Sequence, residues 1–460
     1  MSPGDNRFDA LVIGGGVYGI LLALEGAARG QRVLLMERDD FGAGATFNHL
    51  RTIHGGLRYL QFLDLRRALA SNRQRLWWLR AFPDLIHPIS CLMPLYGQGM
   101  RRPEAFHGAF LMARALGLHK DGDGNPRRMA VIPTDEVEAL LPHCRRDGLD
   151  RGALWQDAFM PLPHRVVAEL LHWAESAGAV VRNRTEFLSA TREAGGRWHV
   201  TAKDVTGGDR LEVVTRWIIN ASGAATDEVV RRMTGMTSSS LLVPTMAWGL
   251  LIDRPPVSAC SAAVAPPGKG RRTYFVHPYH GRVIAGTGHT GIPPAADLPA
   301  AISDAQLRET LSDLNAAMPG VDFTRDEVRH VFRGVLPGVE AGSEALMMHP
   351  KVVDHGADGG APGAWTVLGV KFTEAPFVAN RVWNALLRPE AQALPPRPPA
   401  VAVPTLEEAL AMPDADLAAR LKEISAMEWG ASAEDLSWRR TDFWMNEQLA
   451  ARVSVLAGSQ

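Results

Sequence analysis

The string Gly14-Gly15-Gly16-Val17-Tyr18-Gly19 fits the pattern G-x-G-x-x-G between an apolar, β-prone segment and a helix-forming segment. In this setting Gly14 permits the tight turn, and Gly16 lets the backbone approach a pyrophosphate at the positive end of the helix. Gly19 allows the helix to pack closely on the strand. The string therefore predicts a site for the ADP half of a dinucleotide cofactor.

An acidic residue follows the next predicted strand, as this type of site requires. Glu37 comes directly after Val33–Met36 and is expected to accept hydrogen bonds from the adenosine ribose, with Arg38 beside it as a further candidate. NAD and FAD present the same ADP half, so this fingerprint alone does not separate the two cofactors. Other segments must decide between them.

Composition indicates a globular protein with more than one domain. The chain has 460 residues, 46% of them hydrophobic and 22% charged, which suits two or three domains with sizeable cores. Forty-nine basic residues against fifty acidic ones leave a formal charge of −1. No overall field favours a polyanion, so we do not expect nucleic-acid binding.

Cysteine usage argues against metal and dithiol chemistry. Cys91, Cys144 and Cys260 are far apart and form no C-x-x-C pair, so we expect no disulfide framework, no metal site and no dithiol centre. The chain starts without a basic, signal-like region and contains no apolar run of 18 residues. These features predict a cytoplasmic protein.

The apolar periodicity predicts α/β segments at both ends of the chain and a β-rich stretch between residues 241 and 340. A proline-rich segment near the C-terminus is expected to act as a stiff linker. The main predicted helices are Val17–Arg29, Leu60–Ala81, Val166–Ala177, Asp304–Met318 and Phe377–Leu387. The main predicted strands are Phe8–Ile13, Val33–Met36, Ala179–Val181, Trp198–Val200, Arg210–Thr215, Trp217–Asn220 and Trp365–Leu368.

Several longer strings carry a family resemblance. The segments Asp40–Thr46, DFGAGAT, and Arg51–Leu60, RTIHGGLRYL, resemble the FAD-dependent glycerol-3-phosphate dehydrogenases of the D-amino-acid-oxidase flavoprotein superfamily. Similar matches occur along the whole chain, in residues 219–223 (INASG), 275–279 (FVHPY), 286–288 (GTG), 369–373 (GVKFT) and 433–441 (AEDLSWRRT).

The resemblance implies an α/β fold: a glutathione-reductase-type, Rossmann-like FAD-binding domain, a β-rich substrate domain and a short helical C-terminal tail, with the isoalloxazine between the two domains. The predicted FAD-binding domain comprises residues 1–85, 150–240 and 341–390, and the substrate domain residues 86–149 and 241–340. A linker over 389–404 and a tail over 405–460 complete the chain. The cofactor-binding residues expected besides those above are Ala45, Thr46, His54, Gly55, Gly56, Ala221, Gly223, Gly369, Lys371 and Thr373.

Five residues are candidates for contact with the reacting groups. Lys371 and Thr373 lie between a predicted strand and helix, where positive charge stabilises negative charge at the N1–C2=O edge of a flavin. Arg58 and Tyr59 follow a glycine-rich turn, where an arginine binds an anion bidentately and a tyrosine bonds a polar group. His54 is expected to orient the flavin or the turn; a structural role for it stays equally open, and it is not the first candidate for a general base.

Departures from the family pattern concern the substrate. Leu336 replaces the arginine of the family's GVRP segment, and Arg333 lies three residues earlier as a candidate to compensate. Trp248 falls where the family has the histidine of a KGSH segment, and His289 replaces the aspartate of a GTTD segment. Arg333 and His289 are therefore catalytic candidates, and a phosphate-bearing substrate loses one cation.

These observations predict an FAD oxidoreductase that takes hydride to flavin N5 from a C–OH or C–NH carbon of a small substrate other than glycerol 3-phosphate. Two alternatives are an amine or amino-acid oxidase that uses oxygen, which peroxide formation would reveal, and a low-turnover flavin-binding scaffold. Substrate, electron acceptor (oxygen, quinone or other), oligomeric state and covalent flavin attachment stay open, as does the peripheral membrane contact known in the family.

Overall fold

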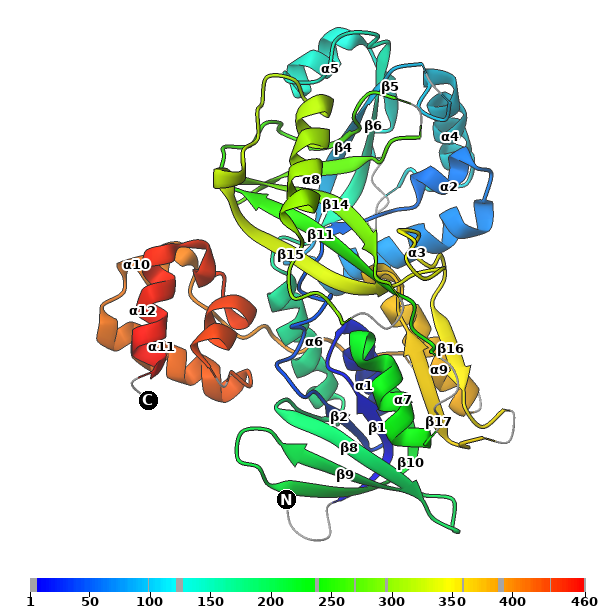
Figure 1. The fold of residues 1–460 in the computed structure, drawn as a ribbon, viewed down its shortest axis with the longest axis vertical. Coiled ribbons are helices and arrows are strands. Elements are labelled where there is room, and N and C mark those ends of the chain that lie inside the picture. Colours follow the sequence, from blue (N-terminus) through cyan, green and yellow to red (C-terminus); the bar gives the residue numbers. More distant parts are fainter. Residues whose placement is uncertain are drawn as a thin grey trace.

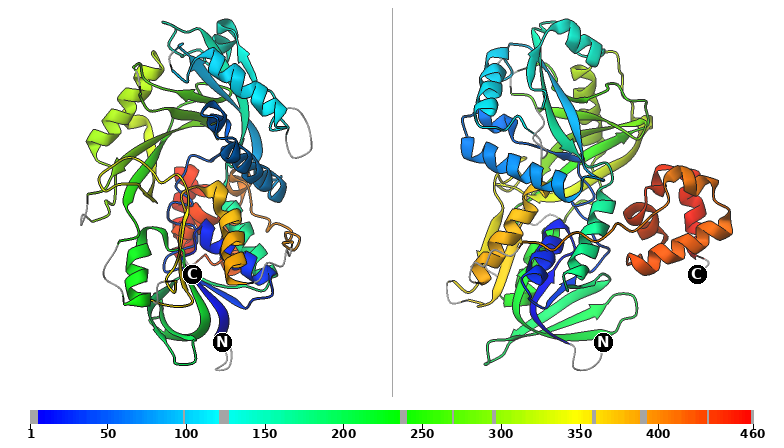
Figure 2. Two further views of the ribbon diagram at one scale, coloured as in Figure 1. Left: turned by 90° about the vertical axis from the view of Figure 1, so that its right-hand side faces the viewer. Right: turned by 180° about the vertical axis from the view of Figure 1, so that it is seen from behind.

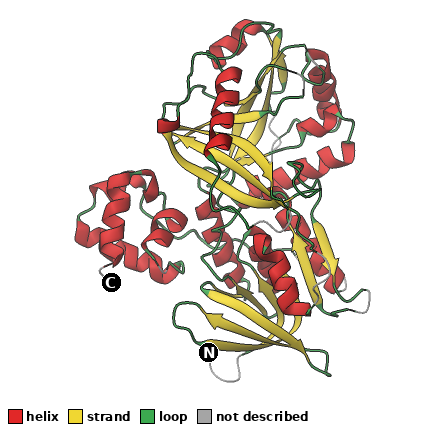
Figure 3. Cartoon of the chain, viewed as in Figure 1, coloured by secondary structure: helices red, strands yellow, loops and turns green. Residues whose placement is uncertain are grey.

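The computed structural model describes residues 6–97, 99–120, 127–235, 240–268, 270–293, 297–357, 360–387, 393–430 and 432–458. Figure 1 shows two lobes, one above the other, each built around a β-sheet, with a small helical tail beside the lower lobe. Figure 3 shows that strands dominate the centres of both lobes and that the tail is helical. The predicted α/β class, with a β-rich second unit and a short helical tail, is confirmed.

The lower lobe contains a mostly parallel sheet. Its spatial order is β16 (Lys351–Asp354), β17 (Ala364–Leu368), β10 (Arg210–Asn220), β1 (Arg7–Ile13), β2 (Val33–Met36) and β7 (Val180–Arg182), with β9 (Trp198–Asp204) pairing with β10 and β8 (Thr185–Arg192) with β9. The strands β17, β10, β1, β2 and β7 are parallel. Because the carboxyl ends of these strands lie at one edge of the sheet, the loops that follow them form one surface.

Helices cover this sheet because its strands are apolar on both faces. One face packs against α1 (Val17–Ala28), α6 (Pro163–Ser176) and α9 (Ala375–Leu386), and α3 (Leu65–Ala81) joins the same core through Trp78. On the other face α7 (Thr226–Thr234) packs with strands β8 and β9. Short 3-10 turns lead into two of these helices, η1 (Gly223–Ala225) and η3 (Phe372–Glu374).

The upper lobe contains a mostly antiparallel sheet. Its order is β15 (Val328–Pro337), β11 (Pro244–Ile252), β14 (Arg282–Gly291), β13 (Tyr274–Tyr279), β12 (Ser261–Val264), β4 (His87–Leu95), β6 (Arg151–Phe159) and β3 (Thr52–Ile53), with β5 (Ala130–Ile132) pairing with β6. One face packs against α8 (Asp304–Ala317) and α5 (Thr134–Leu140), and η2 (Arg325–Glu327) precedes β15. The other face packs against α2 (Leu57–Gln61) and α4 (Pro103–Ala115).

The predicted domain boundary at residue 150 is wrong for the segment that follows it. Strand β6 pairs with β4 along its whole length, and β3 pairs with β6, so both strands lie in the upper sheet although the prediction placed them in the lower domain. Cross-strand pairing decides this assignment, and local sequence does not report it. The remaining division into domains stays a prediction.

One predicted helix and two predicted strands differ from the observed elements. The helix expected over Leu60–Ala81 is interrupted at Phe62–Asp64, because Leu63 is left-handed (φ 58°) and the Asp64 side chain accepts a hydrogen bond from the Arg67 N–H, which starts α3. The two strands expected over Arg210–Thr215 and Trp217–Asn220 form the single strand β10. The break at residue 62 gives α2 its own direction over the cleft.

The tail contains α10 (Leu406–Ala411), α11 (Asp414–Met427), a π-helical turn η4 (Asp435–Arg440), η5 (Phe443–Met445) and α12 (Glu447–Gly458) around its own small core. Figure 2 shows the segment before it crossing the back of the lower lobe. Part of the predicted linker, residues 389–392, lies outside the described residues, and residues 393–404 form no helix or strand.

Buried ion pairs fix the tail to the lower lobe. Asp40, which follows the β2 strand, accepts hydrogen bonds from Arg439 (Nε, 2.7 Å) and Arg440 (Nη2, 2.6 Å). Arg165 on α6 bonds Glu428 at 2.6 Å. The two acids and three bases at these contacts lose water on docking, so removal of either partner would leave the other charge buried and unpaired. Within the described residues, no helix is long and apolar enough to cross a bilayer.

Candidate active site

A cleft of about 2260 Å³ runs from the β1–α1 turn to the faces of β11, β14 and β15. It combines the loops at the carboxyl edge of the lower sheet with the concave side of the upper sheet. Most of the residues singled out from the sequence line it: Gly14, Gly16, Glu37, Arg38, Ala45, Thr46, His54, Gly56, Arg58, Tyr59, Ala221, Gly223, His289, Arg333, Gly369, Lys371 and Thr373. Gly19 and Gly55 lie behind this lining.

The glycine turn is as tight as the pattern requires. A Cβ on Gly19 would lie 1.8 Å from the Gly14 carbonyl oxygen, so only glycine lets α1 approach β1 this closely. Gly14 has φ of 107°, a conformation that L side chains rarely adopt. Gly16 has an ordinary φ, and its Cβ would lie 3.1 Å from Thr46 Oγ1 in the cleft. The start of α1 is therefore bare backbone that faces the cleft.

Polar groups close this end of the cleft. Glu37 Oε2 accepts a hydrogen bond from the Gly15 N–H (2.7 Å), and Oε1 accepts one from the Asp39 N–H (2.8 Å). Burial raises the pKa of Glu37 despite these two bonds. Thr46 Oγ1 accepts from the Val17 N–H at 3.0 Å. Arg38 is half-exposed and pairs with the carboxylates of Asp39 and Glu228, at the rim.

Two predicted residues that are 312 positions apart meet in the middle of the cleft. The Lys371 Nζ donates to the Tyr59 hydroxyl at 2.6 Å and lies 3.3 Å from a carboxylate oxygen of Glu374. The backbone at Lys371 is itself held, because the Tyr18 hydroxyl donates to its carbonyl at 2.7 Å. Gly369 makes room for this contact, since a Cβ there would overlap the Tyr18 ring. Tyr59 and Glu374 thus hold the Lys371 amine, and Tyr18 holds the backbone that carries it.

His54 forms a pair with a buried carboxylate that the sequence did not point out. Its Nδ1 lies 2.9 Å from Asp157 Oδ2, and the Gly55 N–H donates to Oδ1 at 2.8 Å. The Trp155 indole N–H adds a third bond to Asp157. Burial alone would raise the pKa of Asp157, but the His54 ring and these N–H donors hold it below its usual range. The His54 side chain is 52% exposed to the cleft, and that of Asp157 only 5%.

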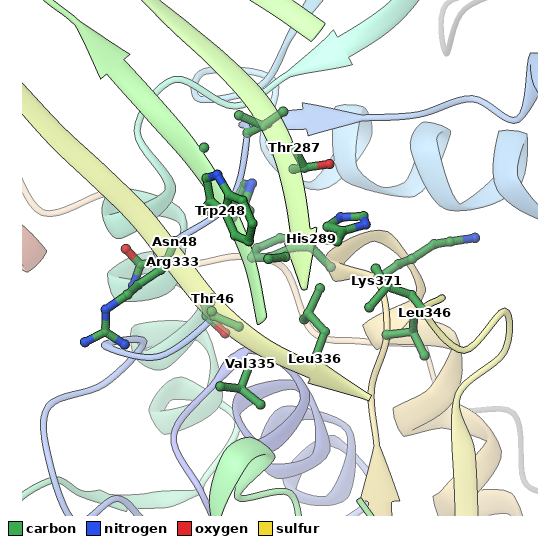
Figure 4. Close-up of a pocket in the computed structure, with 18 of the residues that line it drawn as sticks. Thr46, Asn48, Trp248, Thr287, His289, Arg333, Val335, Leu336, Leu346 and Lys371 are labelled. Atoms are coloured by element: carbon green, nitrogen blue, oxygen red, sulfur yellow. The ribbon is translucent and has the colours of Figure 1, made fainter. Parts of the chain in front are cut away.

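The upper-sheet wall is apolar with one neutral imidazole (Figure 4). The Trp248 indole covers Gly288 and donates to Thr310 Oγ1 on α8 at 3.1 Å. Leu336 and Leu346 line the cleft as well. Leu336 lies on the opposite face of the sheet from Trp248, because Trp248 pairs with Arg333 and Leu336 with Thr245. His289 lies within β14, and burial together with the Arg272 charge lowers its pKa to about 4. His289 is therefore uncharged at neutral pH.

Arg333 does not take the place of the arginine that Leu336 replaces. The two residues are three positions apart on β15, so the alternation of a strand directs them to opposite faces. Arg333 Nη1 bonds the Pro299 carbonyl at 3.5 Å, and Figure 4 shows its guanidinium pointing away from Leu336, His289 and Lys371. The expectation that Arg333 compensates for Leu336 is thus not supported by the geometry.

A family model described as FAD dependent oxidoreductase (DAO) matches residues 9–382. The chain belongs to this family of FAD-dependent oxidoreductases. It is 28% identical over 371 residues to glycerol-3-phosphate dehydrogenase of Synechocystis, a match that covers 77% of this chain and 66% of the relative. The chain thus spans just under two thirds of that relative's length.

Two solved structures share the fold of this chain. The glycerol-3-phosphate dehydrogenase of Bacillus halodurans complexed with FAD superposes with a TM-score of 0.65 at 17% identity, covering 99% of this chain and 82% of the other. Glycine oxidase from Geobacillus kaustophilus superposes with a TM-score of 0.62 at 18% identity, covering 84% of this chain and 96% of the other. The predicted resemblance and the predicted cofactor, FAD, are confirmed.

The residues of the cleft fit an FAD molecule. Bare backbone at Gly16 and the start of α1 suits the pyrophosphate, and Glu37 at the carboxyl end of β2 suits the ribose. The lining of the cleft continues from there to Lys371 and Tyr59. In the described residues, no group of three or more potential metal ligands occurs.

Sequence reasoning missed Asp157 and Tyr18. Asp157 carried one signal, a charged residue inside the apolar run Ala153–Phe159, which in a buried strand is unusual without a partner. Tyr18 falls at a variable position of the glycine string, and nothing local distinguishes it. Both matter because of contacts with residues more than 100 positions away.

Gly16→Val is expected to abolish FAD binding while leaving the protein folded. The backbone at Gly16 tolerates a side chain, but a branched one would fill the approach of the pyrophosphate. The FAD-to-protein ratio after purification and the melting temperature of the apoprotein would check this. Gly108→Val, at a position of α4 where a Cβ meets nothing within 4 Å, is the matched control. A Gly16→Val protein that retains full FAD would refute the assignment.

Proposed function

We propose that this FAD-dependent oxidoreductase oxidises a C–OH or C–NH carbon of a small substrate, with His54 as the general base, and that glycerol 3-phosphate is a poor substrate. FAD bound in the cleft supplies the acceptor for a hydride. The single observation that carries the proposal is the pair of His54 and Asp157, which lines the same cleft as Lys371 and Tyr59.

Asp157 supports the role of His54 by selecting its tautomer. An ionised carboxylate accepts a hydrogen bond from Nδ1–H, which leaves the lone pair on Nε2 facing the cleft. A substrate hydroxyl or ammonium placed against Nε2 would give up its proton there while its carbon loses hydride. The charge that forms on the imidazole is then stabilised by Asp157, itself held by Gly55 and Trp155. The chain has Trp248 in place of the histidine of the family's KGSH segment, and the pair of His54 and Asp157 would supply the base that this replacement removes.

Leu336 argues against a phosphate at the upper-sheet wall, because its side chain is apolar where the family pattern has an arginine. Trp248 pairs with Arg333 across β11 and β15 and so lies on the other face of the sheet, where its indole N–H donates to Thr310. His289 is neutral, and Arg333 faces the other way. Arg272, the cation next to His289, is already paired with Glu344, so a dianion at this wall would lose water without gaining an unpaired cation. Relatives that act on glycerol 3-phosphate are thus expected to differ from this chain at the wall.

The electron acceptor, the membrane contact, the oligomeric state and the cellular compartment stay predictions. An amine or amino-acid oxidase of the same fold would use oxygen, and peroxide formed during turnover would distinguish it from a dehydrogenase with another acceptor. Peripheral membrane contact and the oligomeric state carry no further support. The cytoplasm is the proposed compartment, since all three cysteines are unpaired and buried, as suits a reducing environment.

His54→Asn is expected to slow anaerobic flavin bleaching about a hundredfold or more, because the variant keeps a bond to Asp157 but has no basic nitrogen. Asp157→Asn should also slow it, because an amide donor selects the wrong tautomer of His54. Stopped-flow absorbance of the holoenzyme would measure both rates. His107→Asn, on the exposed side of α4, is the control. Wild-type rates in His54→Asn with full FAD content would exclude the base.

Glycerol 3-phosphate is expected to bleach the flavin at least about a hundredfold less efficiently than the best hydroxy acid, amino acid or polyol in a panel, because an unpaired phosphate beside Leu336 pays its desolvation cost. Leu336→Arg should raise the efficiency with glycerol 3-phosphate, whereas Leu336→Met, which adds no charge, should not. Efficient oxidation of glycerol 3-phosphate by the wild type would contradict the proposal, and no bleaching by any compound would favour a scaffold role.

A further inference from the structure

The segment Asp40–Phe47, here called the cofactor loop, is bonded directly to the glycine turn at the start of α1. The Gly42 N–H donates to the Gly15 carbonyl at 2.9 Å, and the Thr46 hydroxyl accepts from the first N–H of α1 at 3.0 Å. A Cβ on Gly15 would lie 2.5 Å from the Phe41 ring, so the loop also packs tightly on the turn. The position of the turn that faces the pyrophosphate is therefore tied to the position of this loop.

The tail binds the first residue of the cofactor loop through buried charges. Asp40 accepts hydrogen bonds from Arg439 at 2.7 Å and from the two Nη atoms of Arg440 at 2.9 and 2.6 Å. Arg439 also donates to Asp435, whose carboxylate is bonded by Arg184 of the lower lobe. The side chains of Asp40 and Asp435 are fully buried, so loss of an arginine would leave a carboxylate short of a partner away from water.

Two aromatic contacts join the tail to other positions of the cofactor loop. Trp429 lies between α11 and η4, and its ring meets the Phe41 ring edge-on, with 5.7 Å between the centroids. The Trp438 ring meets the Phe47 ring edge-on at 6.2 Å. Phe41 therefore touches the glycine turn at Gly15 and the tail at Trp429. Contacts with the tail are thus spread over the length of the loop.

We propose that the C-terminal tail controls the retention of FAD, because Arg439, Arg440 and Trp429 position the cofactor loop against the glycine turn. These three are positioning residues, since they act on FAD through the loop. The coupling is reciprocal: the docked tail tightens FAD binding by the same factor by which bound FAD stabilises docking of the tail. The inference needs only FAD as the cofactor and does not depend on the base or the substrate.

The first test is the rate of FAD release from the holoenzyme, followed by the fluorescence of free FAD after dilution, at a temperature where circular dichroism shows a folded protein. We expect Trp429→Leu and Arg439→Met to release FAD at least about tenfold faster than the wild type, a factor typical of coupling between two sites. Trp429→Phe should restore most of the slow release, because a phenyl ring keeps an aromatic contact with Phe41.

Arg452→Met is the matched control. Arg452 pairs with Asp414 at 2.7 Å, and its hydrogen bonds to described residues all stay inside the tail. It should release FAD at the wild-type rate. Wild-type release by both Trp429→Leu and Arg439→Met would overturn the inference. Release from Arg452→Met as fast as from these two variants would also overturn it, because the rate would then follow the stability of the tail and not its contact with the loop.

A measurement on the wild type keeps the inference testable if these variants do not fold. Hydrogen–deuterium exchange of residues 424–430, which lie outside the cleft lining, would be compared with FAD bound and after its removal. By reciprocity we expect at least about tenfold slower exchange with FAD bound. The helix α12, which packs in the tail's own core, should exchange equally in both states. Equal exchange of residues 424–430 with and without FAD would contradict the coupling.

Discussion

The contact of Asp157 with the turn before α2 fixes the segment that carries the reacting side chains of the upper lobe. Asp157 lies on β6, and the turn directly follows β3, which pairs with β6 in the same sheet. The carboxylate fixes the His54 ring and the Gly55 backbone, and α2 starts directly afterwards. Arg58 and Tyr59 are thereby directed into the cleft. Loss of this buried acid would leave three donors without an acceptor, at a cost of about 1–3 kcal/mol for each unsatisfied group.

The cleft is assembled from segments that are far apart in the chain but share a few rigid contacts. Tyr59 reaches Lys371 across it, and Tyr18 holds the Lys371 backbone from the cofactor side. At the adenosine end, Asp40 binds Arg439 and Arg440 of the tail, so the loop after Glu37 is fixed by the last segment of the chain. Cofactor site, substrate wall and tail thus form one connected structure.

Local patterns predicted the cofactor end of the site, and long-range pairing decided the rest. The glycine string and Glu37 are recognisable because strand, turn and helix follow each other directly. Asp157 was not predicted, since its importance depends on a partner 103 residues away in the chain. The helix break at Leu63 was missed because an Asp cap competes with helical periodicity. Arg333 and Leu336 are three positions apart. Once their segment is known to be a strand, this odd spacing predicts that the two side chains point to opposite faces of the sheet.

The central claim is that hydride leaves a carbon whose hydroxyl or ammonium group faces His54. A deuterium isotope effect tests this claim most directly. A compound that bleaches the flavin anaerobically would be labelled at its carbinol or amine carbon and compared with the unlabelled form in single-turnover stopped-flow experiments. The account predicts that labelling slows bleaching severalfold, because the C–H bond breaks in the step observed. Equal rates for labelled and unlabelled compounds in both wild type and His54→Asn, where the chemical step is slowest, would contradict it.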